Sequence, residues 1–247
     1  MIHQSRAIVL RTTDFQETSR IVAAYTRDFG KVSLMAKGAK SAKSKYLGKL
    51  DPGMLVDLVY HNKDGRSIQI LSEISLIKPF STQAYQPDRL SARLAFTDLL
   101  NRIIQEGEEH ADLYDKCEQV LLWLNETQQE IIPLFPYVMI RLADWLGFGI
   151  RLDGDIEASA AALFLDPEAG SITQKPGHRA MQLSIPMCSY ITCTIESRRK
   201  DLLEINLSAI EIRQLTYIMD RYLSYHIDGL KPRSVDLLFE SFEGLMV

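Results

Sequence analysis

The sequence predicts an α+β protein, with a small five-stranded β-barrel at residues 1–80 followed by a mainly α-helical domain at residues 81–247. Two observations support this division. Apolar residues form short β-rich runs before residue 80 and recur at helical spacing after it. The charge changes sign at the same place, from 13 Lys and Arg against 7 Asp and Glu to 15 against 25. This segregation indicates a polyanion-binding part and an acidic part that folds by itself or meets a basic partner.

Five β-rich runs precede residue 80, and turn-forming residues separate them. Gly30, in "RDFGK", is placed where a tight turn needs a positive φ, and Asp64-Gly65, in "NKDGR", is a hairpin signal. The runs cover residues 6–13, 19–26, 31–38, 54–61 and 66–77. Short antiparallel strands favour a closed barrel because closure removes exposed edges. Five strands match the oligonucleotide-binding (OB) fold.

A cationic stretch, "MAKGAKSAKSKYLGKL", separates the third and fourth runs at residues 35–50 and contains no acid. Its lysines are Lys37, Lys40, Lys43, Lys45 and Lys49. Gly38 and Gly48 predict a flexible loop, and lysine suits phosphate contact that ignores base sequence. The loop is therefore predicted to bind phosphates, with a solvated loop without ligand as the alternative. Tyr46 and Tyr60 are candidates for base stacking, and packing inside the barrel is the alternative for both rings.

Helical spacing predicts helices at 88–107 and 111–126, a third that starts near Pro133 or Pro136 and a fourth at 208–229. Ser208 and Glu211 form a capping box at the start of the fourth helix. Short connections predict that the helices pack as an antiparallel bundle. For residues 151–205, the sequence predicts an irregular insert with one short strand pair.

Four stretches of the chain, at residues 9–40, 43–52, 142–153 and 222–238, together resemble the RecO family of bacterial recombination-mediator proteins. The resemblance implies an N-terminal OB domain and a helical domain. It also implies binding of single- and double-stranded DNA and annealing of complementary strands. With RecR, such proteins help the RecA recombinase to displace the single-stranded DNA-binding protein, SSB. In relatives, the helical domain binds the acidic C-terminal tail of SSB.

The resemblance also implies site residues. Seven positions that are basic in the family become candidate DNA contacts: Arg11, Arg20, Lys31, Lys37, Lys40, Lys43 and Lys49. Lys45 of the cationic stretch is added to these candidates. Ion pairs with Asp14 and Glu17 are the alternative for some of them. A basic and apolar patch is the candidate dock for the SSB tail, comprising Arg102, Arg141, Arg151, Trp145 and Phe148, with helix-bundle packing as the alternative for the two aromatic rings.

One departure from the family concerns zinc. Many relatives carry a four-cysteine site after the "LGFG" helix, but here that stretch is "RLDGDIEASA", without cysteine. Cys188, Cys193 and His178 offer three ligands at unsuitable spacing, so no structural zinc and no cofactor are expected. Cys117 lies on an apolar helix stripe and is expected in the core. Few cysteines and no signal-peptide pattern favour the reducing cytoplasm, where such a protein would associate with the nucleoid.

No motif for covalent chemistry is present, because the sequence lacks a P-loop, a G-x-S-x-G elbow and an H-E-x-x-H pair. A non-enzymatic DNA-binding mediator is therefore the favoured hypothesis. The alternatives are an OB-fold RNA-binding factor and a protein-binding adaptor with a basic barrel, and a nuclease is the alternative among enzymes.

Overall fold

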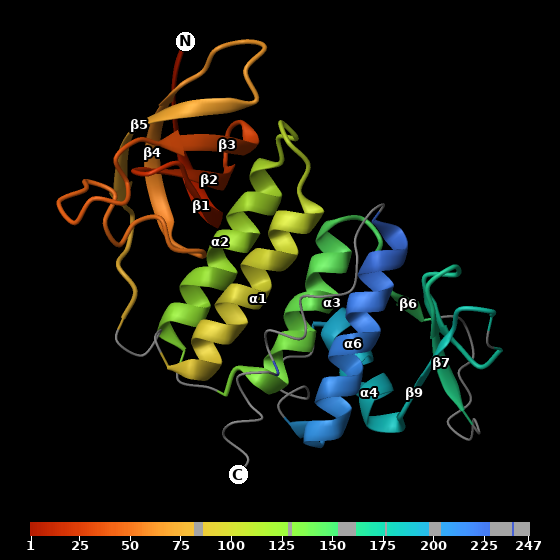
Figure 1. Cartoon of the computed structure of the whole chain (residues 1–247). Coiled ribbons are helices and arrows are strands. Elements are labelled where there is room, and N and C mark those ends of the chain that lie inside the picture. The colour runs from red at the N-terminus through yellow and green to blue at the C-terminus, as the bar shows by residue number, and fades with distance from the viewer. Residues whose placement is uncertain are drawn as a thin grey trace. The chain divides into compact units, whose positions relative to one another are not determined.

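The chain folds into two compact units, Met1–Gln128 with Glu240–Val247, and Gln129–Phe239. Figure 1 shows the computed structural model of the chain. It describes residues 1–81, 86–127, 130–152, 162–175, 177–197, 204–227 and 239. None of the helices in these ranges is both long enough and apolar enough to cross a membrane.

The first unit begins with the predicted five-stranded barrel. Its strands are β1 (Ile2–Phe15), β2 (Ser19–Thr26), β3 (Gly30–Ala36), β4 (Leu55–His61) and β5 (Ile68–Leu76). They close in the order β1-β2-β3-β5-β4, with β1 paired to both β2 and β4 (Figure 1). A bulge between Val9 and Arg11 lets this long strand bend between its two partners. The predicted OB-type barrel is therefore confirmed.

Alternating apolar side chains fill the barrel, as period-two strands require. Fully buried examples are Val9, Ala24, Leu34, Val56 and Leu58. The parallel pairing of β3 with β5 is short, covering only Ser33–Met35 and Ile68–Ile70. Beyond Ile70, the edge of β5 therefore needs other hydrogen-bond donors.

Two helices, α1 (Pro87–Ile103) and α2 (Ala111–Glu126), belong to the same compact unit as the barrel. Arg27 donates to both carboxylate oxygens of Asp115, at 2.7 and 2.8 Å. The Tyr25 hydroxyl donates to the carbonyl of His110 at 2.9 Å. The division predicted at residue 80 therefore marks the change from strands to helices, whereas the first compact unit extends to Gln128. These contacts join residues about 85 positions apart in the chain, which no local pattern reveals.

The second unit contains η2 (Ile132–Leu134), α3 (Phe135–Trp145), α4 (Ile185–Ile195) and α6 (Ala209–His226). The helices predicted to form one bundle are thus divided between the two units. The predicted capping box is present, because Ser208 accepts from the Glu211 amide and Glu211 accepts from the Ser208 amide. Glu211 also accepts a hydrogen bond from Ser184, which connects the start of α6 to that of α4. The predicted helix end at Gly229 lies outside the described residues.

The insert forms a four-stranded sheet rather than one strand pair. Its order is β6 (Arg151–Leu152), β8 (Ser171–Thr173), β7 (Leu163–Asp166) and β9 (Met181–Leu183). Strands of two to four residues are too short to display alternation, so the sequence pattern underestimates their number. Helix α4 was also missing from the prediction because it is apolar along most of its length.

Candidate nucleic-acid interface

The segment from Lys37 to Leu50, here called the lysine loop, follows β3 and leads toward β4 (Figure 1). Its backbone forms successive tight turns, with hydrogen bonds from Ser44 to Ser41 at 2.9 Å and from Leu47 to Ser44 at 3.2 Å. Gly38 and Gly48 have φ angles of 71° and 69°, which glycine adopts without strain. The loop's backbone is therefore folded into turns, and its glycines serve those turns.

Three side chains attach the lysine loop to the unpaired part of β5. The Tyr46 hydroxyl donates to the Leu71 carbonyl at 2.9 Å, and the Lys49 ammonium donates to the Ile74 carbonyl at 3.2 Å. The Lys45 ammonium donates to the Ser72 carbonyl. The loop thus supplies donors to the stretch of β5 that follows its short pairing with β3. Lys45 and Lys49 accordingly support the fold, and their ammonium groups are partly committed before any ligand arrives.

Lys40 lies beside the hairpin between β1 and β2. The Lys40 amide donates to the Thr18 carbonyl at 3.0 Å, and its ammonium lies 3.2 Å from Asp14. Arg20 approaches the same carboxylate at 3.1 Å. Lys40 and Arg20 together lower the pKa of Asp14, so this carboxylate stays ionised. Both cations therefore lie next to an acid, as the alternative interpretation of the sequence had it.

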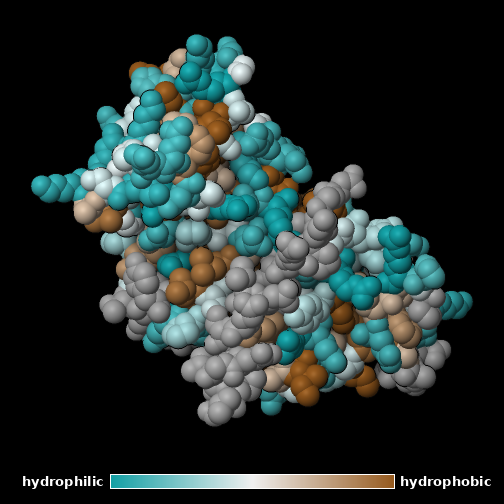
Figure 2. All heavy atoms as spheres, viewed as in Figure 1, coloured by the Kyte–Doolittle hydropathy of each residue, from teal (hydrophilic) through white to brown (hydrophobic). Residues whose placement is uncertain are grey.

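We call Arg11, Arg20, Lys37, Lys40 and Lys43 together the cation cluster. Arg20 and Lys40 share Asp14, and Arg20 lies opposite Ala36, the residue before Lys37. Arg11, Lys37, Lys40 and Lys43 are exposed, and Arg20 is half-buried. Within the described part of the chain, the charged ends of Arg11, Lys37 and Lys43 have no ion-pair or hydrogen-bond partner. Figure 2 shows that the visible face of the barrel is mostly hydrophilic. Five cations against Asp14 and Glu17 leave this surface positive, which favours binding of a polyanion.

Lys31 lies where the barrel meets the end of α1. Its ammonium donates to the carbonyl of Asn101 at the end of α1, and burial lowers its pKa. The Gly107 amide also donates to the Lys31 carbonyl at 3.1 Å. Lys31 therefore connects the barrel to the helices of the first unit. Its basic character alone gave no indication of this role.

Neither predicted stacking residue offers a ring face. Tyr46 is 4% exposed and Tyr60 is 1% exposed, and both belong to the barrel core. Burial raises the pKa of Tyr60 to about 12, and its hydroxyl lies 3.1 Å from His3. Barrel packing, the alternative interpretation, is therefore correct.

The five residues of the predicted dock for the SSB tail are divided between the two units. Arg102 belongs to the first unit and pairs with Asp98 at 3.1 Å. In the second unit, Arg141 lies 3.5 Å from Asp144, and Arg151 donates to the Ala169 carbonyl at 2.7 Å. Phe148 stacks on His226 with ring centroids 5.0 Å apart, and Trp145 is half-buried at the end of α3. These cations already have partners inside their own units.

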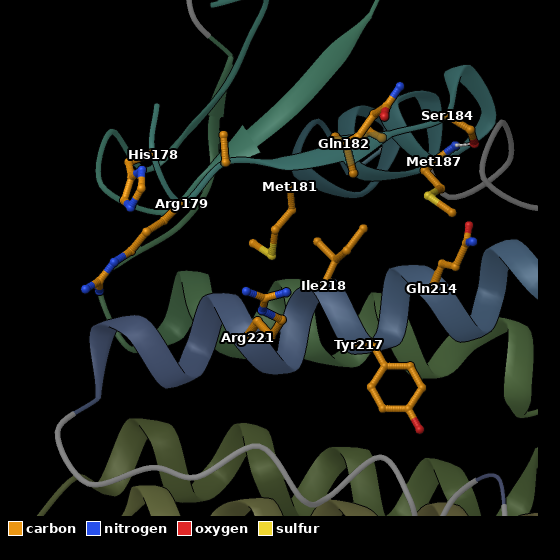
Figure 3. Close-up of a pocket in the computed structure, with 12 residues that line it drawn as sticks. His178, Arg179, Met181, Gln182, Ser184, Met187, Gln214, Tyr217, Ile218 and Arg221 are labelled. Carbon is orange, nitrogen blue, oxygen red and sulfur yellow. Dashed lines mark hydrogen bonds between the residues drawn. The ribbon is translucent and has the colours of Figure 1, made fainter. Parts of the chain in front are cut away.

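A groove of about 650 Å³ lies elsewhere in the second unit, between α6 and the segment that includes β9. Its lining combines cationic and apolar side chains, among them His178, Arg179, Met181, Met187, Ile218 and Arg221. In Figure 3, Met181 and Ile218 point toward each other, whereas Tyr217 points to the opposite side of α6. Glu168 lies 4.0 Å from Arg179, but no acidic side chain is among the lining residues that the structure describes. The groove thus suits an anionic ligand with an apolar part.

The three cysteines lie in two helices, α2 and α4. Cys188 and Cys193 are buried in α4, and burial raises the pKa of Cys117 in α2. His178 is exposed at the groove. Among the described residues, no three His, Cys, Asp or Glu side chains gather as metal ligands. The donor set in these ranges does not fit the four-cysteine zinc site of many relatives.

Two family descriptions match nearly the whole chain. "Recombination protein O N terminal" matches residues 1–80, and "Recombination protein O C terminal" matches residues 84–236. A protein named DNA repair protein RecO from Chlorobium limicola is 29% identical, over 96% of this chain and 97% of that protein. A namesake from Pelodictyon phaeoclathratiforme is 30% identical, over 94% of this chain and 95% of that protein. A third, from Salinibacter ruber, is 27% identical, over 98% of this chain and 95% of that protein.

Proposed function

The chain belongs to the RecO family, and from this premise we propose that it is a DNA-binding recombination mediator of the bacterial cytoplasm and nucleoid. Family membership supports a role in DNA repair and recombination. The finer proposal is that the protein binds single- and double-stranded DNA and anneals complementary strands. With RecR as partner, it would help RecA to replace SSB on DNA. The observation that carries the DNA-binding part is the cation cluster on a closed OB-type barrel.

The cation cluster suits backbone contact more than base recognition. Lys37, Lys40 and Lys43 are compact point charges that contact phosphates in any sequence, whereas base recognition favours the planar fork of arginine. Neutralising phosphates reduces the repulsion between two strands, and base pairing then supplies the free energy of annealing. This action needs no covalent step, so we propose that the protein is not an enzyme.

Strand annealing tests this proposal directly. Two complementary oligonucleotides with a donor and an acceptor fluorophore are mixed with and without the protein. We expect the protein to accelerate duplex formation without ATP, and to do so less at high salt because phosphate contacts are screened. A non-complementary pair is the control. An unchanged annealing rate would contradict the proposal, and shortened strands on a denaturing gel would indicate a nuclease instead.

We further propose that the groove beside α6, rather than the predicted five-residue patch, receives the C-terminal tail of SSB. Arg179 and Arg221 offer charge to acidic side chains, and Met181, Met187 and Ile218 offer an apolar lining to the tail's apolar end. Apolar pockets with a few charged groups are the usual form of small-ligand sites.

Charge reversal at Arg179 and Arg221 is expected to weaken binding of a labelled SSB-tail peptide at least about tenfold, since opposed charges become like charges. Fluorescence anisotropy measures the peptide's affinity. Lys175→Glu, at an exposed position in the same unit, is the matched control for each single variant, R179E or R221E, and should change the affinity less than about twofold. A loss for K175E equal to that for R179E and for R221E would place the tail elsewhere.

A further inference from the structure

Leu47 is an apolar side chain exposed in the middle of the lysine loop. It is 69% exposed, although its neighbours Tyr46 and Leu50 are buried. In the described part of the first unit, the other large apolar side chains of comparable exposure are Met1 and Ile2, at the chain start. A leucine therefore faces solvent between the lysines of this loop.

The surrounding contacts hold Leu47 in this outward position. Tyr46 is buried in the barrel core, and its hydroxyl bonds to the Leu71 carbonyl. Lys45 and Lys49 bond to two further carbonyls of β5, one on each side of Leu47 along the chain. Gly48 completes the turn with a φ of 69°. Hydrogen bonds to β5 on both sides of Leu47 therefore restrain the backbone that carries it. Because the backbone is already ordered, little conformational entropy is lost when the side chain contacts a ligand.

The charges around Leu47 indicate what it meets. The Leu47 amide donates to the Ser44 carbonyl at 3.2 Å, in the run of turns that also carries Lys43 of the cation cluster. A phosphate backbone held by these lysines would have its bases within reach of an apolar side chain. Leucine is one of the residues that proteins insert between base steps, which partly unstacks them.

We propose that Leu47 is a wedge that enters between stacked bases of DNA bound to the cation cluster. This inference rests on the proposed DNA-binding function and adds a specific action on duplexes. Insertion would unstack one base step and expose base edges to an incoming complementary strand. Single-stranded DNA, whose bases are less ordered, needs the wedge less.

A duplex that carries 2-aminopurine, whose fluorescence rises when it is unstacked, reports the proposed insertion. The wild-type chain is expected to raise this fluorescence at saturation. Leu47→Ala should lose most of the rise while its affinity for single-stranded DNA changes less than about twofold, because the phosphate contacts remain. Leu47→Met keeps an apolar side chain of similar volume and should retain the rise. Ile2→Ala, which removes an exposed apolar side chain from the same barrel, is the matched control.

The outcomes separate this inference from the proposed function. If the wild-type chain binds no DNA in an anisotropy titration, the proposed function fails. If it binds but L47A raises the fluorescence as much as the wild type, only the wedge is wrong. An equal loss of fluorescence for L47A and I2A would also overturn the wedge.

Discussion

Replacing Lys37, Lys40 and Lys43 together by Glu is expected to remove most of the affinity for single-stranded DNA. Each substitution places a negative charge where the cation cluster would contact a phosphate, so attraction becomes repulsion. The loss should be similar for all base sequences, because phosphate contacts carry no sequence information. The fold should persist, since these side chains are exposed and the ion pair of Lys40 with Asp14 lies at the surface. Circular dichroism and anisotropy measure the two effects.

A second triple variant separates position from total charge. Lys63, Arg66 and Lys175 are exposed and lie outside the lysine loop. Changing these three to Glu alters the net charge equally, yet should weaken DNA binding much less than K37E/K40E/K43E. Equal losses would mean that overall charge, and not this cluster, governs binding.

Gly30→Ala is expected to destabilise the first unit by about 2–4 kcal/mol, because two costs combine. Gly30 begins β3 with a φ of 65°, a conformation that is unfavourable for alanine. A Cβ atom there would also lie 2.4 Å from the carbonyl oxygen of Glu108, in the connection between α1 and α2. Because that neighbour is backbone, it cannot rotate away. The barrel and the helices would have to separate locally.

Gly65→Ala is the matched control for this prediction. Gly65 has a similar φ of 74°, but nothing lies within 4 Å of its Cβ position. Gly65→Ala should therefore lower the free energy of unfolding only by the cost of placing alanine at a positive φ, about 1 kcal/mol. Of the two tryptophans, Trp123 belongs to the first unit and Trp145 to the second, so urea unfolding in a Trp145→Phe background follows the first unit. Equal stability losses for G30A and G65A would show that the contact with Glu108 does not matter.

The barrel was predictable because its strands are long enough to show alternation and because Gly30 and Asp64-Gly65 mark its turns. The capping box at Ser208 was predictable for the same reason, since its signal is local. The lysine loop was recognisable as a site candidate by composition. These features all depend on residues close together in the chain.

The roles of individual lysines were not predictable in this way. Lys45 and Lys49 bond to β5, and Lys31 bonds to the end of α1, whereas Lys37 and Lys43 have no such partner among the described residues. The difference depends on carbonyl groups about 25 to 70 positions distant. The same limit applies to Tyr46, whose burial depends on a gap in strand pairing. It also applies to the groove, whose lining residues lie up to 43 positions apart in the chain.

The most direct test of the central claim is the salt dependence of binding to a labelled single-stranded oligonucleotide. The logarithm of the binding constant is plotted against that of the salt concentration for the wild type and for K37E/K40E/K43E. The account predicts that the variant's slope is shallower by about 2, since each lost phosphate contact removes about 0.7. Identical slopes would contradict it, because the lysine loop would then contact no phosphate.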